Sequence, residues 1–193
     1  MRAFLFVAAL LAAGVAHADP VTYVIDPAHT QVAFSIDRFG FTRVLGRFDE
    51  VAGEIILDEA SPANSSVRAS IQIASISSGN ATRDEHLRAE RWLNAAQFPT
   101  MEFRSTAVRL TGERRAEVIG NLTLLGQTHA VTLDVTLNRL GESPSNRRPT
   151  AGFSATGTLS RSAFGSAIAA NLIGDAVAVN IEALGQVPAP PAN

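Results

Sequence analysis

The residues best suited to chemistry gather in one stretch, RDEHLRAERW at positions 83–92. Histidine, arginine and acidic side chains in this mixture could support acid–base catalysis, metal binding or anion binding. His86 and Glu90 are four residues apart, so on a helix they share a face and could both contact a metal ion. A zinc site needs three or four ligands, and no HExxH pattern is present. We interpret the pair as a solvated helix face, with arginines guarding a mouth for an anionic head group as the functional alternative.

Other catalytic combinations are weak. Asp26 and His29 lie in the segment DPAHT, where an aspartate typically caps the backbone N–H groups of a turn. His129 is expected in an exposed hairpin. The serines of LSRSAFGSA, 159–167, lack a GxSxG pattern, and there is no phosphate-binding loop or dinucleotide fingerprint. The chain has no cysteine and all 16 of its basic residues are arginine, which excludes a thiol nucleophile and a Schiff-base lysine. The sequence predicts no catalytic site, no metal site and no cofactor.

The elements that would position these residues are mostly strands. Apolar and polar residues alternate most clearly in VTLDVTLN, 131–138, and again in 31–37 and 67–73. This period of two indicates half-buried antiparallel strands. Residues 21–25 are expected to continue into 31–37 around the Asp26-Pro27 turn. The remaining predicted strands are 51–58, 101–110, 115–125, 153–160 and 177–183, which makes about eight in total.

Three segments depart from simple alternation. In 101–110 the parity of the apolar positions changes, and a β-bulge is the simplest explanation. FGFTRVLGRF, 39–48, predicts a loop or short helix closing one end. Thr82 and Glu85 fit a capping box, so we expect a helix of about three turns that begins at Thr82 and ends before Pro99.

The pattern of about eight antiparallel strands and one helix allows two folds. The sheet can form a sandwich, or it can close into a barrel, which at eight strands can hold one small ligand. Four phenylalanines, Phe34, Phe39, Phe41 and Phe48, fall within fifteen residues. They could fill a core or line an aromatic cavity.

The first 18 residues have the features of a secretory signal. They combine Arg2, an apolar run and an Ala16-His17-Ala18 cleavage site. The run is short for the alternative, a membrane anchor, so we expect cleavage after Ala18. Loss of Arg2 leaves 15 arginines against 18 acids, a formal charge of −3 that does not fit a nucleic-acid binder. One domain is expected over 19–186, followed by a proline-rich, disordered tail at 187–193.

Several motifs occur in a characteristic order. Tyr-x-Ile-Asp-x-x-His at 23–29 precedes Val-x-Phe-x-Ile at 32–36. The most specific is Asn-x-x-Arg-Asp-x-His-Leu-Arg at 80–88, followed by Phe-Pro-Thr-x-x-Phe at 98–103. Further matches are Gly-Arg-Phe at 46–48, Gly-Glu-Ile at 53–55, Gly-Asn-Leu-Thr-x-x-Gly-x-Thr at 120–128 and Ile-Gly-Asp-x-Val at 173–177. Together they resemble the YceI-like family of bacterial periplasmic proteins, which are lipocalin-like and bind polyisoprenoids.

The resemblance implies an all-β fold, an eight-stranded antiparallel barrel with helical elements closing or flanking one end. Its interior would be an apolar tunnel for an isoprenoid chain, either a polyprenyl phosphate or an isoprenoid quinone. Segment 83–103 would lie at or beside the end of the barrel. The predicted ligand-binding residues are Phe34, Ile36, Phe39, Phe41, Ile71, Ile73, Leu87, Trp92, Phe98 and Phe103, with Arg83 and His86 at the mouth.

The expected function is a periplasmic carrier that sequesters such a lipid without catalysing a reaction. One alternative is an enzyme acting on an amphiphile, with His86 or His29 as acid or base. Another is an interaction protein whose interior is filled core. The resemblance also allows a homodimer and a membrane-protein partner, such as a quinone-linked cytochrome, while the net negative charge predicts no nucleic-acid partner.

Overall fold

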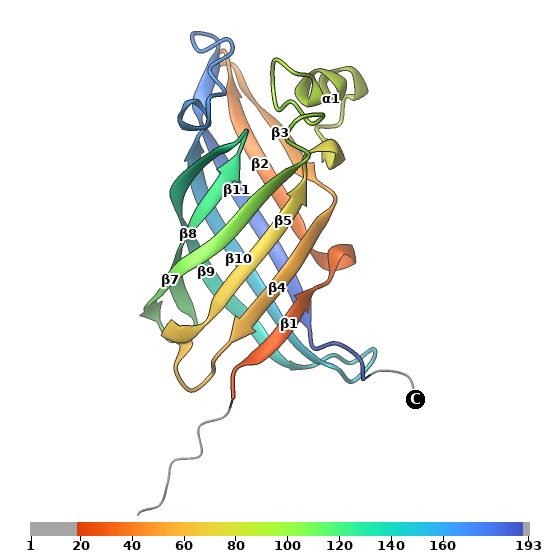
Figure 1. The fold of residues 1–193 in the computed structure, drawn as a ribbon, viewed down its shortest axis with the longest axis vertical. Coiled ribbons are helices and arrows are strands. Elements are labelled where there is room, and N and C mark those ends of the chain that lie inside the picture. Colours follow the sequence, from red (N-terminus) through yellow and green to blue (C-terminus); the bar gives the residue numbers. More distant parts are fainter. Residues whose placement is uncertain (1–18, 191–193) are drawn as a thin grey trace, which may run out of the picture.

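A computed structural model describes residues 19–190, and the predicted signal and the last three residues of the predicted tail lie outside this part. The described chain forms a tall antiparallel barrel with one short helix at one end (Figure 1). The strands are β1 (Val21–Ile25), β2 (Gln31–Arg38), β3 (Thr42–Phe48), β4 (Val51–Leu57), β5 (Ser66–Gln72), β6 (Ile76–Ser77), β7 (Thr100–Gly112), β8 (Arg115–Leu124), β9 (Gln127–Glu142), β10 (Pro149–Ser160) and β11 (Ile173–Gln186). The helix is α1 (Ala81–Arg88), and short 3-10 turns are η1 (Pro27–His29), η2 (Pro62–Asn64), η3 (Ile73–Ser75) and η4 (Ser162–Phe164).

The strands close into a barrel rather than a sandwich. The order around the barrel is β1-β4-β5-β7-β8-β9-β10-β11, and β11 pairs with β1 to complete the ring. β2 continues β1 along β11, β3 precedes β4 beside β2, and β6 continues β5 beside β3. Three of the eight long strands are therefore interrupted once. The predicted count of about eight and the continuation of 21–25 into 31–37 are confirmed.

The prediction of a loop or short helix at 39–48 is wrong for most of that segment. Thr42–Phe48 forms β3, and only the tip of the hairpin is a turn. Gly46 lies inside this strand because the Phe34 ring packs over it: a Cβ at Gly46 would come within 2.4 Å of Phe34 Cζ. Gly46 suggests a loop in the sequence, but its role is to leave room for the Phe34 ring of the neighbouring strand β2.

The predicted bulge in 101–110 is confirmed. The register of β7 against β8 shifts between Ser105 and Ala107, so Thr106 is the extra residue. Because of this insertion, Phe103 before the bulge and Val108 after it both face the interior, although one position is odd and the other even.

The predicted helix is present but shorter, and its cap is different. Asn80, rather than Thr82, is the N-cap, and its Oδ1 accepts the Arg83 N–H at 2.9 Å. α1 ends at Arg88, and the chain then turns so that the Leu93 N–H reaches the Leu87 carbonyl at 3.0 Å. In a continuous helix Leu87 and Trp92 would point about 140° apart. The early end allows both to face the barrel. Within residues 19–190, no helix is long and apolar enough to cross a membrane.

Candidate ligand cavity

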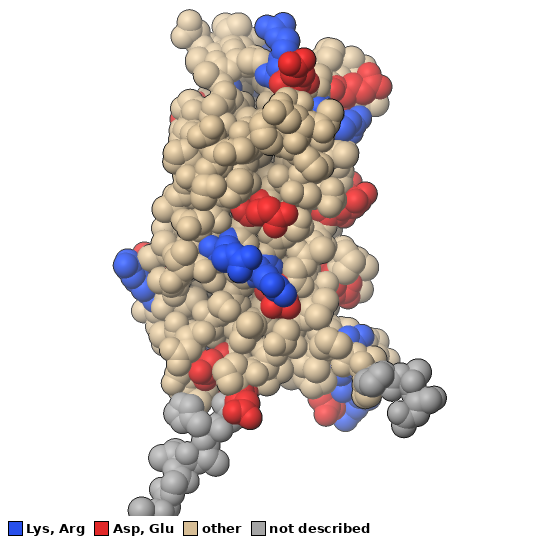
Figure 2. Space-filling view, viewed as in Figure 1, with Lys and Arg blue, Asp and Glu red and all other residues tan. Residues whose placement is uncertain are grey.

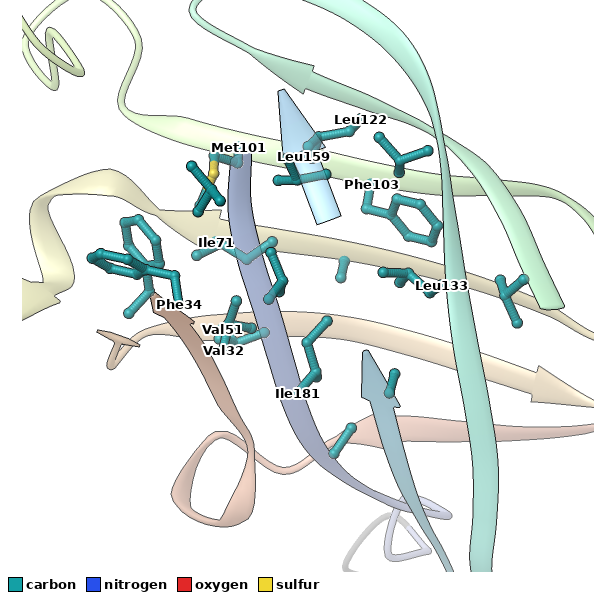
Figure 3. A pocket seen from close by; sticks show the side chains of 18 of the residues that line it. Val32, Phe34, Val51, Ile71, Met101, Phe103, Leu122, Leu133, Leu159 and Ile181 are labelled. Carbon is teal, nitrogen blue, oxygen red and sulfur yellow. The ribbon is translucent and has the colours of Figure 1, made fainter. Parts of the chain in front are cut away.

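The barrel is hollow along its length. A cavity of about 990 Å³ is lined by side chains from every long strand and from the α1 region. This volume lies at the upper end of what small-molecule sites usually have. Figure 3 shows the inward side chains of its middle part, which carry no charge. The labelled residues are Val32, Phe34, Val51, Ile71, Met101, Phe103, Leu122, Leu133, Leu159 and Ile181.

Strand alternation produces this lining directly. On β9, Val131, Leu133 and Val135 point inward, while Thr132 and Asp134 are exposed on the outer surface. Neighbouring strands keep this register, for example Val135 opposite Ala155, and Ala155 opposite Ile181. Since side chains that face each other across the barrel do not meet in the middle, the apolar face of every strand borders one continuous space.

At one end of the barrel, α1 and the turn that follows it lie over the cavity, and we call them the α1 cover. Leu87, Trp92 and Leu93 border the cavity from this side. Asp84, which is buried, holds the cover in place: its carboxylate accepts the Ser78 N–H at 2.8 Å and the Ser78 hydroxyl at 2.5 Å. Asn80 and Asp84 thus fix both the start of α1 and its attachment to the preceding strand.

Three arginines, Arg38, Arg83 and Arg161, border the cavity at the same end without a carboxylate in ion-pair contact. Arg83 donates to the Ser78 hydroxyl at 2.8 Å and to the Ser78 carbonyl at 2.7 Å. Arg161 is buried and donates to the backbone carbonyls of Ser166, Ile173 and Gly174. None of the ion pairs among the described residues includes any of the three guanidinium groups. This end of the cavity therefore offers guanidinium groups that suit an anionic or carbonyl-bearing group, and Asp37 is the acid that borders it.

The opposite end of the cavity is bordered by loops with mixed charge. Glu59, Glu113, Arg114 and Arg115 lie there. Nearby Tyr23 is almost fully buried, and this burial, followed by the Glu59 carboxylate, raises the pKa of its phenol. This end thus offers two arginines and two glutamates, so its charges balance, although none of the four takes part in an ion pair among the described residues.

Eight of the twelve residues predicted to bind the ligand border the cavity. They are Phe34, Ile36, Ile71, Arg83, His86, Leu87, Trp92 and Phe103. Phe34 also contacts Phe48 with ring centroids 5.7 Å apart, and both rings face the cavity below the α1 cover.

The other four predicted residues lie elsewhere, each for a local reason. Phe39 and Phe41 are on the β2–β3 hairpin tip and face solvent, where they border a separate surface groove. Ile73 belongs to η3, where the strand is interrupted, and is completely buried in the packed wall. Phe98 lies against the β8–β9 turn, since a Cβ at Gly126 would be 3.0 Å from its ring.

Sequence reasoning missed much of the aliphatic lining. The clearest example is β9, whose alternation was recognised but whose inward residues were not chosen as ligand contacts. The same signal would have found Val177, Val179 and Ile181 on β11. Arg161 gave no such signal, because nothing in LSRSAFGSA shows that its guanidinium turns inward.

The three histidines among residues 19–190 do not assemble a reactive group. His29 is paired with Asp26 at 2.8 Å on the outside of the barrel, and this hydrogen bond is the main reason that the pKa of Asp26 is lowered. Asp26 also accepts the Ala28 N–H at 2.9 Å, which confirms the predicted turn. His129 meets the Phe164 ring edge-on at 5.0 Å. His86 alone borders the cavity, and no three potential metal ligands cluster in the described part of the chain.

The sequence model of the YceI-like domain matches residues 23–184. The chain belongs to the YceI-like family. A UPF0312 protein of Pseudomonas savastanoi pv. phaseolicola is 38% identical over 159 residues, 81% of each chain. A Campylobacter jejuni YceI protein of known structure has a TM-score of 0.69 and 27% identity, covering 77% of this chain and 88% of its own.

A more distant structure shares the fold. A polyisoprenoid-binding domain from Saccharophagus degradans, implicated in plant cell wall breakdown, has a TM-score of 0.61 and 15% identity over 86% of this YceI-like chain and 98% of its own. At that identity the likeness concerns the barrel alone.

Proposed function

We propose that this YceI-like protein binds and sequesters a lipid with an isoprenoid chain, and that the barrel cavity is its site. The observation that carries the proposal is the continuous apolar lining of a cavity of about 990 Å³. A filled-core interaction protein would have no such space. The ligand class is taken from the description of the Saccharophagus degradans domain as polyisoprenoid-binding, which the proposal carries over to the shared barrel.

The size of the cavity suits a chain of several isoprene units. If each carbon-sized group takes about 30 Å³, as a water molecule does in the liquid, the cavity holds roughly 33 such groups, or about six isoprene units. Each buried CH₂ contributes about 0.8 kcal/mol, so a long chain needs no specific polar contact to bind firmly.

We place the head group at the α1 end in this proposal. Arg83 and Arg161 supply the positive charge, and His86 and Trp92 border the same region. A phosphate could accept charge-assisted hydrogen bonds from either guanidinium, and a quinone carbonyl could accept one. With the signal removed, the protein would act in the periplasm, where an insoluble lipid needs a carrier to leave a membrane.

A matched pair of variants on β9 tests the site. Val131 borders the cavity, and its neighbour Thr132 is exposed on the outside. Val131→Asn places an amide in the cavity. This amide loses its hydrating water when an apolar chain enters. An unpaired buried amide costs about 1–3 kcal/mol, so the affinity for a polyprenyl phosphate should fall roughly 5- to 100-fold. Thr132→Asn should leave it unchanged.

The measurement is displacement of a fluorescent apolar probe by farnesyl and longer polyprenyl phosphates. Equal affinities for Val131→Asn, Thr132→Asn and the unmodified protein would contradict binding inside the barrel. In that case the lipid, if bound at all, would lie on the outer surface.

A further inference from the structure

Four large apolar side chains are exposed at the α1 end of the barrel, outside the cavity. Phe41 is 91% exposed, Leu45 67%, Leu172 54% and Phe39 43%. Phe39, Phe41 and Leu45 belong to the β2–β3 hairpin, and Leu172 belongs to the loop between β10 and β11 (Figure 1). We call these four residues the apolar tip. In Figure 2 the charged residues of this end gather towards the α1 side, and the corner opposite α1 is uncharged.

The apolar tip is held in a fixed and strained conformation. Phe39 and Gly40 have φ angles of 59° and 70°, so a bulky aromatic residue occupies the left-handed region that favours glycine or asparagine. The turn is fixed by the Phe41 N–H to the Arg38 carbonyl at 3.1 Å and by the Gly40 N–H to the Asp37 carboxylate at 2.9 Å. Strain of this kind that exposes an aromatic ring to water indicates a function for the ring.

The apolar tip adjoins the wall of the cavity. A surface groove runs between the two loops of the tip, and Asp37 and Ile173 border both this groove and the large cavity. The Phe39 N–H donates to the Leu172 carbonyl at 2.9 Å and joins the two loops. Between β2 and β11 the register shifts from Ile173 to Val177, so the barrel wall is irregular at this place.

Two arginines lie on the same hairpin as the exposed rings. The Arg38 guanidinium lies 3.8 Å from the centre of the Phe39 ring, and the Arg43 guanidinium is held on the outer face of the hairpin by hydrogen bonds to the Ser35 hydroxyl and carbonyl. Neither takes part in an ion pair within residues 19–190. Asp37, the nearest acid on the hairpin, is occupied in capping the turn. Aromatic rings beside arginines suit the boundary between lipid head groups and acyl chains.

We propose that the apolar tip docks on a lipid bilayer and presents the α1 end of the barrel to the membrane. The size of the tip favours a bilayer over a second copy of the chain. The four side chains of the tip together expose at most about 510 Å² if a whole large side chain offers about 200 Å². A stable dimer buries about 800 Å² per partner. The proposal goes beyond ligand binding and does not depend on which lipid the cavity holds.

Vesicle flotation tests the docking. The protein without its signal is mixed with vesicles of phosphatidylethanolamine and phosphatidylglycerol, and the bound fraction is measured against lipid concentration. Phe41→Ser should weaken partitioning at least tenfold, and Phe39→Asn, which suits the turn better, should weaken it with no loss of melting temperature. Val24→Ser is the control, since Val24 is 44% exposed on β1 towards the opposite end.

Two results would overturn the proposal. In one, Phe41→Ser and the unmodified protein bind vesicles equally. In the other, the unmodified protein does not bind vesicles but sediments as a dimer that Phe41→Ser dissociates, which would assign the tip to contact between copies. Probe displacement in solution is measured on the same samples. Its failure would refute isoprenoid binding without affecting the docking result, and docking can fail while displacement succeeds.

Discussion

Substituting Ala155 with phenylalanine should shorten the lipid chain that the barrel accepts. Ala155 lies in the middle of β10, borders the cavity and faces Val135 and Ile181 on the neighbouring strands. Ala155→Phe adds about six side-chain carbons to this space. A ligand that fills the cavity must withdraw an equal number of carbons, a little more than one isoprene unit, into water.

The magnitude follows from the burial that is lost. At about 0.8 kcal/mol for each buried carbon, six carbons correspond to about 5 kcal/mol. If the chain recovers half of this by bending, about 2.5 kcal/mol remains, and the affinity of a cavity-filling chain falls roughly 60-fold. Chains two or more units shorter should bind as before. The fold should tolerate the ring, because it enters open space rather than a packed core.

Probe displacement with a series of polyprenyl phosphates of increasing length measures this effect. Thr156→Phe is the matched control, since Thr156 is the next residue on β10 and is exposed on the outside. The reasoning is refuted if Ala155→Phe, with an unchanged melting temperature, binds all chain lengths as tightly as Thr156→Phe does.

Three further predictions concern the frame around the cavity. Gly120→Ala should lower stability by about 1–3 kcal/mol in urea unfolding, because the new Cβ would lie 2.4 Å from Phe103 Cζ and 2.6 Å from a backbone oxygen; an unchanged midpoint would contradict the packing. Hydrogen bonding, mainly from the Ser160 hydroxyl, lowers the pKa of Asp175, so its stabilisation is present at neutral pH and is lost as the pH falls below about 4. Asp175→Asn should therefore reduce the fall in melting temperature on acidification, and an equal fall in both proteins would refute this. Asn80→Ala removes the cap of α1 and should cost about 1 kcal/mol locally, seen as faster amide exchange over 81–88 while the β-strands stay protected.

The barrel could be predicted from the sequence where the polarity of a strand repeats every two residues. β9 shows this best, since its apolar positions give both the strand and its inward face. The sequence pattern did not distinguish a closed barrel from a sandwich, because closure depends on pairing between β1 and β11, which are far apart in the chain. That decision came from the resemblance and is confirmed by the ring of strands.

The errors come from tertiary contacts that local patterns do not contain. In the sequence Gly46 suggests a loop, and only the structure shows that the Phe34 ring packs against it. The helix after Asn80 has good helix-forming residues beyond Arg88, yet it ends there, where turning back brings Trp92 to the cavity. Phe39 and Phe41 were expected inside on composition and resemblance alone, and no local pattern shows that a hairpin tip exposes them.

The most direct test of the central claim is mass spectrometry of the organic extract from protein that is isolated from cells without detergent. The predicted result is a lipid with an isoprenoid chain, present at about one per barrel. If this chain is longer than the shortened cavity of the Ala155→Phe variant, the lipid should be absent from extracts of that variant. An empty extract, together with failure of the purified protein to take up added polyprenyl phosphate, would contradict it.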